Sequence, residues 1–236
     1  MKIIATTLGE TTGDLLSMTL NIGYLISLVI TFGIFVVVLF IQLKNRKFSP
    51  YLYWLVIVAT TTLGTEISDF MDRTLGLGYA WGALILFICL MLVLLIWYKK
   101  EGELKIYPIY NMRVEIYYWI AILFSNSLGT AFGDYLSDNI GLSYFTGALV
   151  TGAIILVVVL LHYFTKLNQI LLFWIAFIFT RPFGATFGDL LTKPGAKGGM
   201  HFGTGLASII AAGLLLILII VTHKKKINSH NQEKVS

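Results

Sequence analysis

Long apolar stretches alternate with short polar segments along the whole chain. The clearest stretches cover residues 25–43, 51–62, 83–98, 117–124, 147–164, 170–180 and 206–222. The shorter ones reach the roughly 20 residues that a helix needs to cross a bilayer only when the polar motif beside them is included. The pattern predicts helices at residues 3–20, 22–43, 50–72, 79–98, 116–137, 145–165, 168–191 and 203–222.

The polar motif beside these stretches occurs four times, and each copy has a glycine five residues before an aspartate. The copies are LGETTGD at 8–14, LGTEISD at 63–69, LGTAFGD at 128–134 and FGATFGD at 183–189. Successive aspartates are 55, 65 and 55 residues apart, and a tryptophan stands fifteen residues before each of the last three. Four copies at such intervals indicate an internal repeat. We expect the tryptophans, Trp54, Trp119 and Trp174, to anchor the membrane interface.

Each repeat reads as two helices, of which the first carries the motif and the second is plainly apolar. The repeats cover residues 1–48, 49–112, 113–167 and 168–222 of a single membrane domain, 1–222, and a short basic tail follows at 223–236. Because every repeat crosses the membrane twice, all four should point the same way. The sequence thus predicts an all-α integral membrane protein. It would have about eight transmembrane helices, as four tandem parallel two-helix repeats around a pseudo-symmetric centre.

Composition supports a membrane protein, because 57% of the residues are hydrophobic and only 12% are charged, whereas soluble domains carry about 25% charged residues. The net charge of +5 does not indicate nucleic-acid binding, since the positive residues lie in loops and tail. Loops between repeats and the tail carry Lys44, Arg46, Lys47, Lys99, Lys100, Lys105, Arg113, Lys166, Lys224, Lys225 and Lys226. Turns within repeats carry only Arg73, Lys193 and Lys197. We therefore expect a multi-pass protein of the cell inner (plasma) membrane with both termini in the cytoplasm.

A polar stripe runs along the first helix of every repeat. Counting back from each aspartate by four and eight residues gives Thr6, Glu10, Asp14; Thr61, Thr65, Asp69; Asn126, Thr130, Asp134; and Arg181, Ala185, Asp189. A neighbouring stripe adds Glu66. Such side chains must face one another or water inside a membrane. We expect them to converge at the centre of the bundle.

The charges of this centre point to cations. Six carboxyls face one cation within the predicted spans, Arg181; they are Glu10, Asp14, Glu66, Asp69, Asp134 and Asp189. An ionised carboxylate at a helix centre costs about 2.5–3.5 kcal/mol, so the remainder must be protonated, hydrated or bound to a cation. Carboxylate and hydroxyl oxygens suit Mg²⁺, Ca²⁺ or Mn²⁺. We expect the four aspartates to be metal ligands, and Asp72, Arg73 and Asp138 to lie at the membrane interface.

The leading functional hypothesis is a transporter or channel for a small cation, either a divalent metal or an ion coupled to protons. The ion-binding residues would be the four aspartates with Glu10, Glu66, Arg181, Thr61, Thr65, Asn126 and Thr130. The expected partners are the lipid bilayer and the cation, and neither a cofactor nor an enzymatic activity is expected. One alternative is a membrane scaffold or sensor that transports nothing.

A remote alternative is an intramembrane aspartyl protease. That class has a glycine two residues before its Gly-Asp pair, where this chain has Thr11, Ala131 and Thr186. Four equivalent acids also fit poorly with the two differentiated acids of such a protease. This alternative is therefore the weakest of the three.

The chain resembles a family of bacterial integral membrane proteins built from four tandem two-helix repeats of unknown function, often labelled only "uncharacterised membrane-anchored protein". The resemblance covers almost the whole chain and rests on ATTLGETTGD (5–14), FWIAFIFTRPFGATFGDLLTKP (173–194) and the repeated tryptophan. It implies the repeat architecture but no activity. Members normally have a full first helix, so we expect either a short first helix here or a start of translation upstream.

Overall fold

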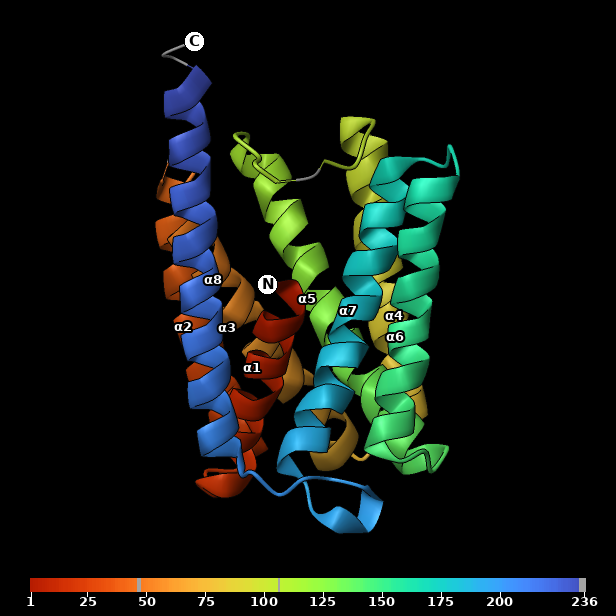
Figure 1. Ribbon diagram of the computed structural model, residues 1–236. Helices are drawn as coiled ribbons and strands as arrows, with labels where there is room; N and C mark the ends of the chain where they lie inside the picture. The colour runs from red at the N-terminus through yellow and green to blue at the C-terminus, as the bar shows by residue number, and fades with distance from the viewer. Residues whose placement is uncertain (46–47, 106, 234–236) are drawn as a thin grey trace.

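The computed structural model describes residues 1–45, 48–105 and 107–233, and these fold into eight α-helices without any strand (Figure 1). The helices are α1 (Lys2–Asp14), α2 (Tyr24–Lys44), α3 (Pro50–Asp69), α4 (Tyr79–Glu101), α5 (Met112–Asp134), α6 (Tyr144–Phe164), α7 (Gln169–Thr192) and α8 (Thr204–Glu233). Three π-helical turns, η1 (Leu15–Thr19), η2 (Phe70–Thr74) and η3 (Tyr135–Asn139), and the 3₁₀ turn η4 (Gly195–Lys197) complete the order. The chain is all-helical, as its sequence predicts.

Among the described residues, five helices are long and apolar enough to cross a membrane: α2, α4, α6, α7 and the part of α8 at Thr204–Lys224. Their outward faces are apolar and exposed, with Val29 on α2 64% and Ile209 on α8 72% exposed. An apolar exterior of this extent is typical of a protein that is surrounded by lipid. The remaining helices, α1, α3 and α5, carry the polar motif and lie inside the bundle.

Local signals in the sequence begin several helices. Ser49 accepts a hydrogen bond from the backbone N–H of Leu52 (3.4 Å) before α3, whose first residue is proline. Asn168 does the same before α7, accepting from the N–H of Ile170 at 2.8 Å. Gly78, directly before α4, has φ +75°, a conformation that only glycine adopts readily. These caps and turns place the helices close to where the apolar pattern predicts them.

Four inner helices form a closed ring in which α1 contacts α3, α3 contacts α5, α5 contacts α7 and α7 contacts α1. Each outer helix packs on the inner helix of the following repeat, so α2 lies on α3, α4 on α5 and α6 on α7. The last outer helix, α8, packs on α1, as Figure 1 shows. The final helix therefore brings the two ends of the chain together and completes the outer layer around the ring.

The motif glycines make the ring tight. A Cβ added to the first glycine of each motif would collide with the residue that stands eight before the aspartate of the next repeat. The pairs are Gly9 with Thr61, Gly64 with Asn126, Gly129 with Arg181, and Gly184 with Thr6. The fourth pair returns to the first repeat, so one contact rule holds around the whole ring. Close helix approach at small residues is how helices pack inside membranes.

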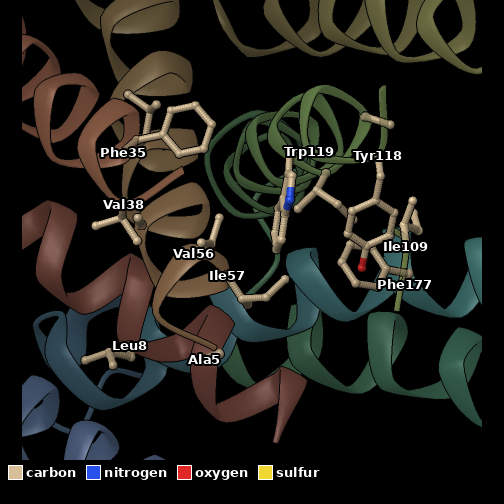
Figure 2. Packing of buried hydrophobic residues seen from close by; sticks show 14 of the residues in the cluster. Ala5, Leu8, Phe35, Val38, Val56, Ile57, Ile109, Tyr118, Trp119 and Phe177 are labelled. Carbon is tan, nitrogen blue, oxygen red and sulfur yellow. The ribbon is translucent and has the colours of Figure 1, made fainter. Parts of the chain in front are cut away.

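Aromatic side chains fill the end of the bundle opposite the aspartates. Trp119 is fully buried and lies between Ile57 and Tyr118 in Figure 2. Trp174 is also buried, at 3% exposure, and packs edge-on against Trp97 with ring centroids 5.8 Å apart. The expectation that the repeated tryptophans anchor the interface is therefore wrong for these two, because the inner helices turn them into the core.

The ends of some helices differ from the prediction. The first helix is short, α1 covering Lys2–Asp14, and a π-helical turn follows it where a continuous helix to residue 20 was expected. At the other end, α8 continues to Glu233, through most of the predicted tail of 223–236. Residues 234–236 of that tail, and Arg46 and Lys47 of the predicted cytoplasmic set, lie outside the described residues.

Candidate functional site

The polar stripes of the four inner helices meet, as predicted, and Arg181 joins them. This arginine on α7 is fully buried. Its Nη2 donates to Glu10 Oε2 (2.9 Å) on α1, to Thr65 Oγ1 (2.5 Å) on α3 and to Thr130 Oγ1 (2.7 Å) on α5. It also donates to the backbone carbonyl of Thr61 at 3.3 Å. One guanidinium thus contacts the other three inner helices.

A further basic residue, Lys2, lies beside this network on the aromatic side. Its Nζ donates to Asn126 Oδ1 at 3.2 Å and stands 3.4 Å from the centre of the Phe177 ring. Asn126 in turn donates to Thr60 Oγ1 at 3.1 Å. The sequence prediction started the first helix at residue 3 and so left Lys2 out. Asn126 is where it was predicted, within the converging stripes.

The four repeat aspartates lie at the ends of the inner helices, where two further cations each bridge two of them. Lys193 Nζ is 2.5 Å from Asp14 Oδ2 and 3.6 Å from Asp189 Oδ1. In the other pair, the Arg73 guanidinium is 3.0 Å from Asp69 Oδ1 and 3.6 Å from Asp134 Oδ2. All four carboxyl groups are buried.

The prediction of a single counter-ion was therefore wrong. Arg73 was placed at the membrane interface and Lys193 in a turn, yet both side chains reach inward to the acids with only 29% and 20% exposure. Both stand four residues after an aspartate of the motif, Asp69 and Asp189, a spacing that puts two side chains on one face of a helix. That spacing was the signal in the sequence that could have identified them.

The surroundings of the two bridging cations differ. The guanidinium of Arg73 stands 5.9 Å from the ring of Tyr24 and 5.7 Å from the ring of Tyr79, within reach of cation–π attraction. Lys193 follows the end of α7 and has no such ring contact among the described residues. Burial lowers the pKa of Lys193, but the carboxylates Asp189 and Asp14 outweigh burial and raise that pKa above its usual value. The ammonium is therefore charged at neutral pH.

Three carboxyls come close enough to share one metal ion. Glu10, Asp134 and Asp189 each offer one oxygen, and these three oxygens all lie within 4.8 Å of one another. All three residues are buried, and they come from α1, α5 and α7. Two of the four predicted aspartate ligands belong to this group, while Asp14 and Asp69 contact the bridging cations at shorter distances.

Glu66 is a buried acid that lies mostly among other acids. Its side chain is fully buried on α3, and neither carboxyl oxygen forms a hydrogen bond of ordinary length among the residues that the structure describes, although the Ser17 hydroxyl acts on it. A Cβ on Gly13 of α1 would lie 3.5 Å from Glu66 Oε1, so this carboxyl faces α1. The charges that act on it most strongly are those of Asp69, Asp14 and Glu10, all negative. A buried acid among acids is a demanding position that a bound cation would relieve.

The fourth repeat differs from the others just after its aspartate. A π-helical turn directly follows Asp14, Asp69 and Asp134, whereas α7 continues as an α-helix past Asp189. Single π-helical turns occur frequently at functional sites. The fourth repeat supplies instead both Arg181 and Lys193, so the ring is asymmetric in charge although its packing repeats.

Comparison with known proteins identifies the family of this chain. No curated protein and no solved structure matches the chain at a significant level. The sequence model of a repeat family matches four times, at residues 1–48, 52–103, 117–168 and 172–228. These matches agree with the four repeats predicted from the Gly…Asp motif, and together they cover most of the chain. The chain therefore belongs to the family described as Repeat of Unknown Function (DUF347).

Proposed function

We propose that this protein moves a small cation across a membrane, using the buried carboxyls at the centre of its inner ring. The observation that carries the proposal is the trio Glu10, Asp134 and Asp189, whose oxygens lie within 4.8 Å of one another in the bundle. Glu66, buried near Asp69, Asp14 and Glu10 with neither oxygen in a hydrogen bond of ordinary length among the described residues, supports it independently. Three or four carboxylate oxygens are the ligands that hard divalent cations prefer.

In the proposed arrangement all eight helices span the bilayer, as four parallel repeats with both termini in the cytoplasm. The aspartate ends of the inner helices would then face the outside, and the aromatic end would face the cytoplasm. A cation entering from outside would pass Lys193 and Arg73 before it reaches the trio. Arg181, held by Glu10 and the threonines, would keep a positive charge beside the carboxylates after the cation leaves.

Uptake by reconstituted protein tests this proposal. Full-length protein in liposomes that contain a Mn²⁺-quenched dye should take up Mn²⁺ faster than empty liposomes. The variants Glu10→Gln, Asp134→Asn and Asp189→Asn should each lower the rate by about tenfold or more, since each removes a charged ligand. Glu115→Gln is the matched control, because Glu115 is also a buried acid. It lies at the aromatic end, where Gln42 and Trp119 donate hydrogen bonds to it, and its removal should leave uptake unchanged.

A scaffold that transports nothing is the second candidate, and a specific observation favours it. Arg181, Arg73 and Lys193 already contact five of the six central carboxyls, so most of the cluster could simply hold the helices together through ion pairs. Uptake no faster than in empty liposomes, by protein that elutes as one folded species, would favour this scaffold and refute transport.

A further inference from the structure

We propose that Lys193 is a built-in competitor for the transported cation, and that the cation must carry two charges to displace it. This inference rests on the proposed function and adds to it the class of substrate and the residue that controls binding. It begins with the two carboxyls that the Lys193 ammonium bridges.

The Lys193 ammonium occupies a cation position in the acid cluster. Its Nζ lies 2.5 Å from Asp14 Oδ2 and 3.6 Å from Asp189 Oδ1. Asp189 is also one of the three residues whose oxygens lie within reach of a single metal ion. A metal ion on Glu10, Asp134 and Asp189 would therefore compete with the ammonium for the same carboxylate.

Lys193 can leave this position by rotation of its own side chain. Its backbone is held in place, because its N–H donates to the Asp189 carbonyl at 2.9 Å and its carbonyl accepts from His201 at 3.3 Å. The ammonium stands on a flexible four-carbon stem, and 20% of the side chain is exposed at the edge of the cluster. Asp14 and Asp189 behind it have side-chain exposures of only 2% and 4%.

Arg73, the cation that bridges the other two aspartates, is held more firmly. Its guanidinium contacts Asp69 at 3.0 Å and is flanked by the rings of Tyr24 and Tyr79. A planar group that both pairs and stacks is harder to displace than a point charge on a flexible stem. Of the two bridging cations, Lys193 is therefore the one that an incoming ion would replace.

The surplus of carboxyl groups in the cluster makes such a replacement favourable for a divalent ion. Exchanging the ammonium for a monovalent ion leaves the charge of the cluster unchanged, so six carboxyl groups still face three positive charges. A divalent ion adds one positive charge beside Glu10, Asp134 and Asp189. Lys193 would thus keep monovalent ions out and set the concentration at which a divalent ion binds.

Binding of Mn²⁺ to the purified full-length protein in detergent tests the inference. Lys193→Gln should lower the apparent Kd for Mn²⁺ by about fivefold or more, which corresponds to the loss of one strong, partly exposed ion pair. It should also allow K⁺ to compete with Mn²⁺. Lys193→Arg should stay close to the original protein, because it keeps the charge. Lys105→Gln is the matched control, since within the described residues Lys105 pairs with Glu103, at the exposed far end of the bundle.

A second measurement needs no variant. In the unaltered protein, Mn²⁺ should increase the acylation of Lys193 by a water-soluble lysine reagent, measured by mass spectrometry, and leave Lys105 unchanged. An unaltered or weaker Mn²⁺ affinity in Lys193→Gln, or unaltered Lys193 labelling, would overturn the inference. Full Mn²⁺ binding by Glu10→Gln and Asp189→Asn would instead overturn the proposed function, so the two failures are distinguishable.

Discussion

Arg181 Nη2 donates to Glu10 Oε2 at 2.9 Å, and the two side chains are 0% and 4% exposed. This ion pair joins the fourth repeat to the first at the point where the ring of inner helices closes. The two threonines that also accept from Arg181, Thr65 and Thr130, come from the second and third repeats. One guanidinium therefore contacts all the other repeats, and no other repeat has a cation at the equivalent position, where the others carry Thr6, Thr61 and Asn126.

Replacing Arg181 by glutamine should destabilise the protein strongly. The change leaves Glu10 as a buried charge without its cation, a loss that typically costs about 3–5 kcal/mol. The midpoint of thermal unfolding in detergent should fall accordingly, and Arg113→Gln, at an exposed arginine, should leave it unchanged. The double variant Glu10→Gln with Arg181→Gln should recover part of the loss. A midpoint equal to that of the original protein would show that the pair does not hold the ring.

The glycine contact rule predicts a contrast between two helix glycines. Gly9→Ala should destabilise by about 1–3 kcal/mol, because the new methyl group would meet the side chain and backbone of Thr61 on the neighbouring inner helix. Gly33→Ala on the outer face of α2 meets nothing within 4 Å and should be neutral or slightly stabilising, since alanine favours helix more than glycine does. The midpoints of thermal unfolding of both variants test this contrast. Equal midpoints would contradict the close approach of Gly9 to Thr61.

The helices and repeats could be predicted from the sequence, because the regular spacing of the motif copies is enough to identify a repeat. Eight helices, four repeats and the convergence of the polar stripes all follow from the Gly…Asp motif and apolar periodicity. The pairing of each outer helix with the next repeat could not be read in this way, since all four outer helices are similarly apolar. The roles of Arg73 and Lys193 were missed because both stand at helix ends, where a long basic side chain can turn either to water or inward.

The hydrogen-bonded phenol of Tyr107 leads us to expect that the folded protein loses stability at high pH. It lies in the connection between α4 and α5, donates to Glu115 Oε1 at 3.2 Å and accepts from Gln42. Burial, then the nearby charge of Glu115, raises its pKa above the ordinary value. The neutral phenol is thus favoured in the folded state, so its contribution is complete below about pH 10 and is lost as the pH rises further.

The midpoint of unfolding should therefore fall between neutral pH and strongly alkaline pH, and Tyr107→Phe should fall less steeply. Tyr110→Phe is the matched control, because Tyr110 is 76% exposed in the same connection. Identical pH profiles for the original protein and Tyr107→Phe would contradict this role.

The proposed eight-span arrangement predicts which loops share a side. In a Cys89→Ser background, cysteines at Glu103 and Lys166 should react with an impermeant thiol reagent from one side of the membrane. A cysteine at Leu77 should react only from the other side. In the proposed arrangement each repeat would cross twice, so the loops between repeats would all return to the same side. Labelling of Leu77→Cys and Glu103→Cys from the same side would refute the arrangement.

Glu66 offers a test of whether the cluster is built for stability or for binding. A buried carboxyl near Asp14 and Asp69, with neither oxygen in a hydrogen bond of ordinary length among the described residues, costs free energy when no cation is bound. Glu66→Gln should therefore raise the unfolding midpoint measured without added cation, by about 2–4 °C for 1 kcal/mol in a chain of this size. The same variant should weaken Mn²⁺ binding and remove the stabilisation that Mn²⁺ gives the original protein.

Glu115→Gln, which removes a well-bonded acid, should lower the midpoint instead. If Glu66→Gln lowers it as much as Glu115→Gln does, Glu66 holds the helices together and its place in a cation site is lost.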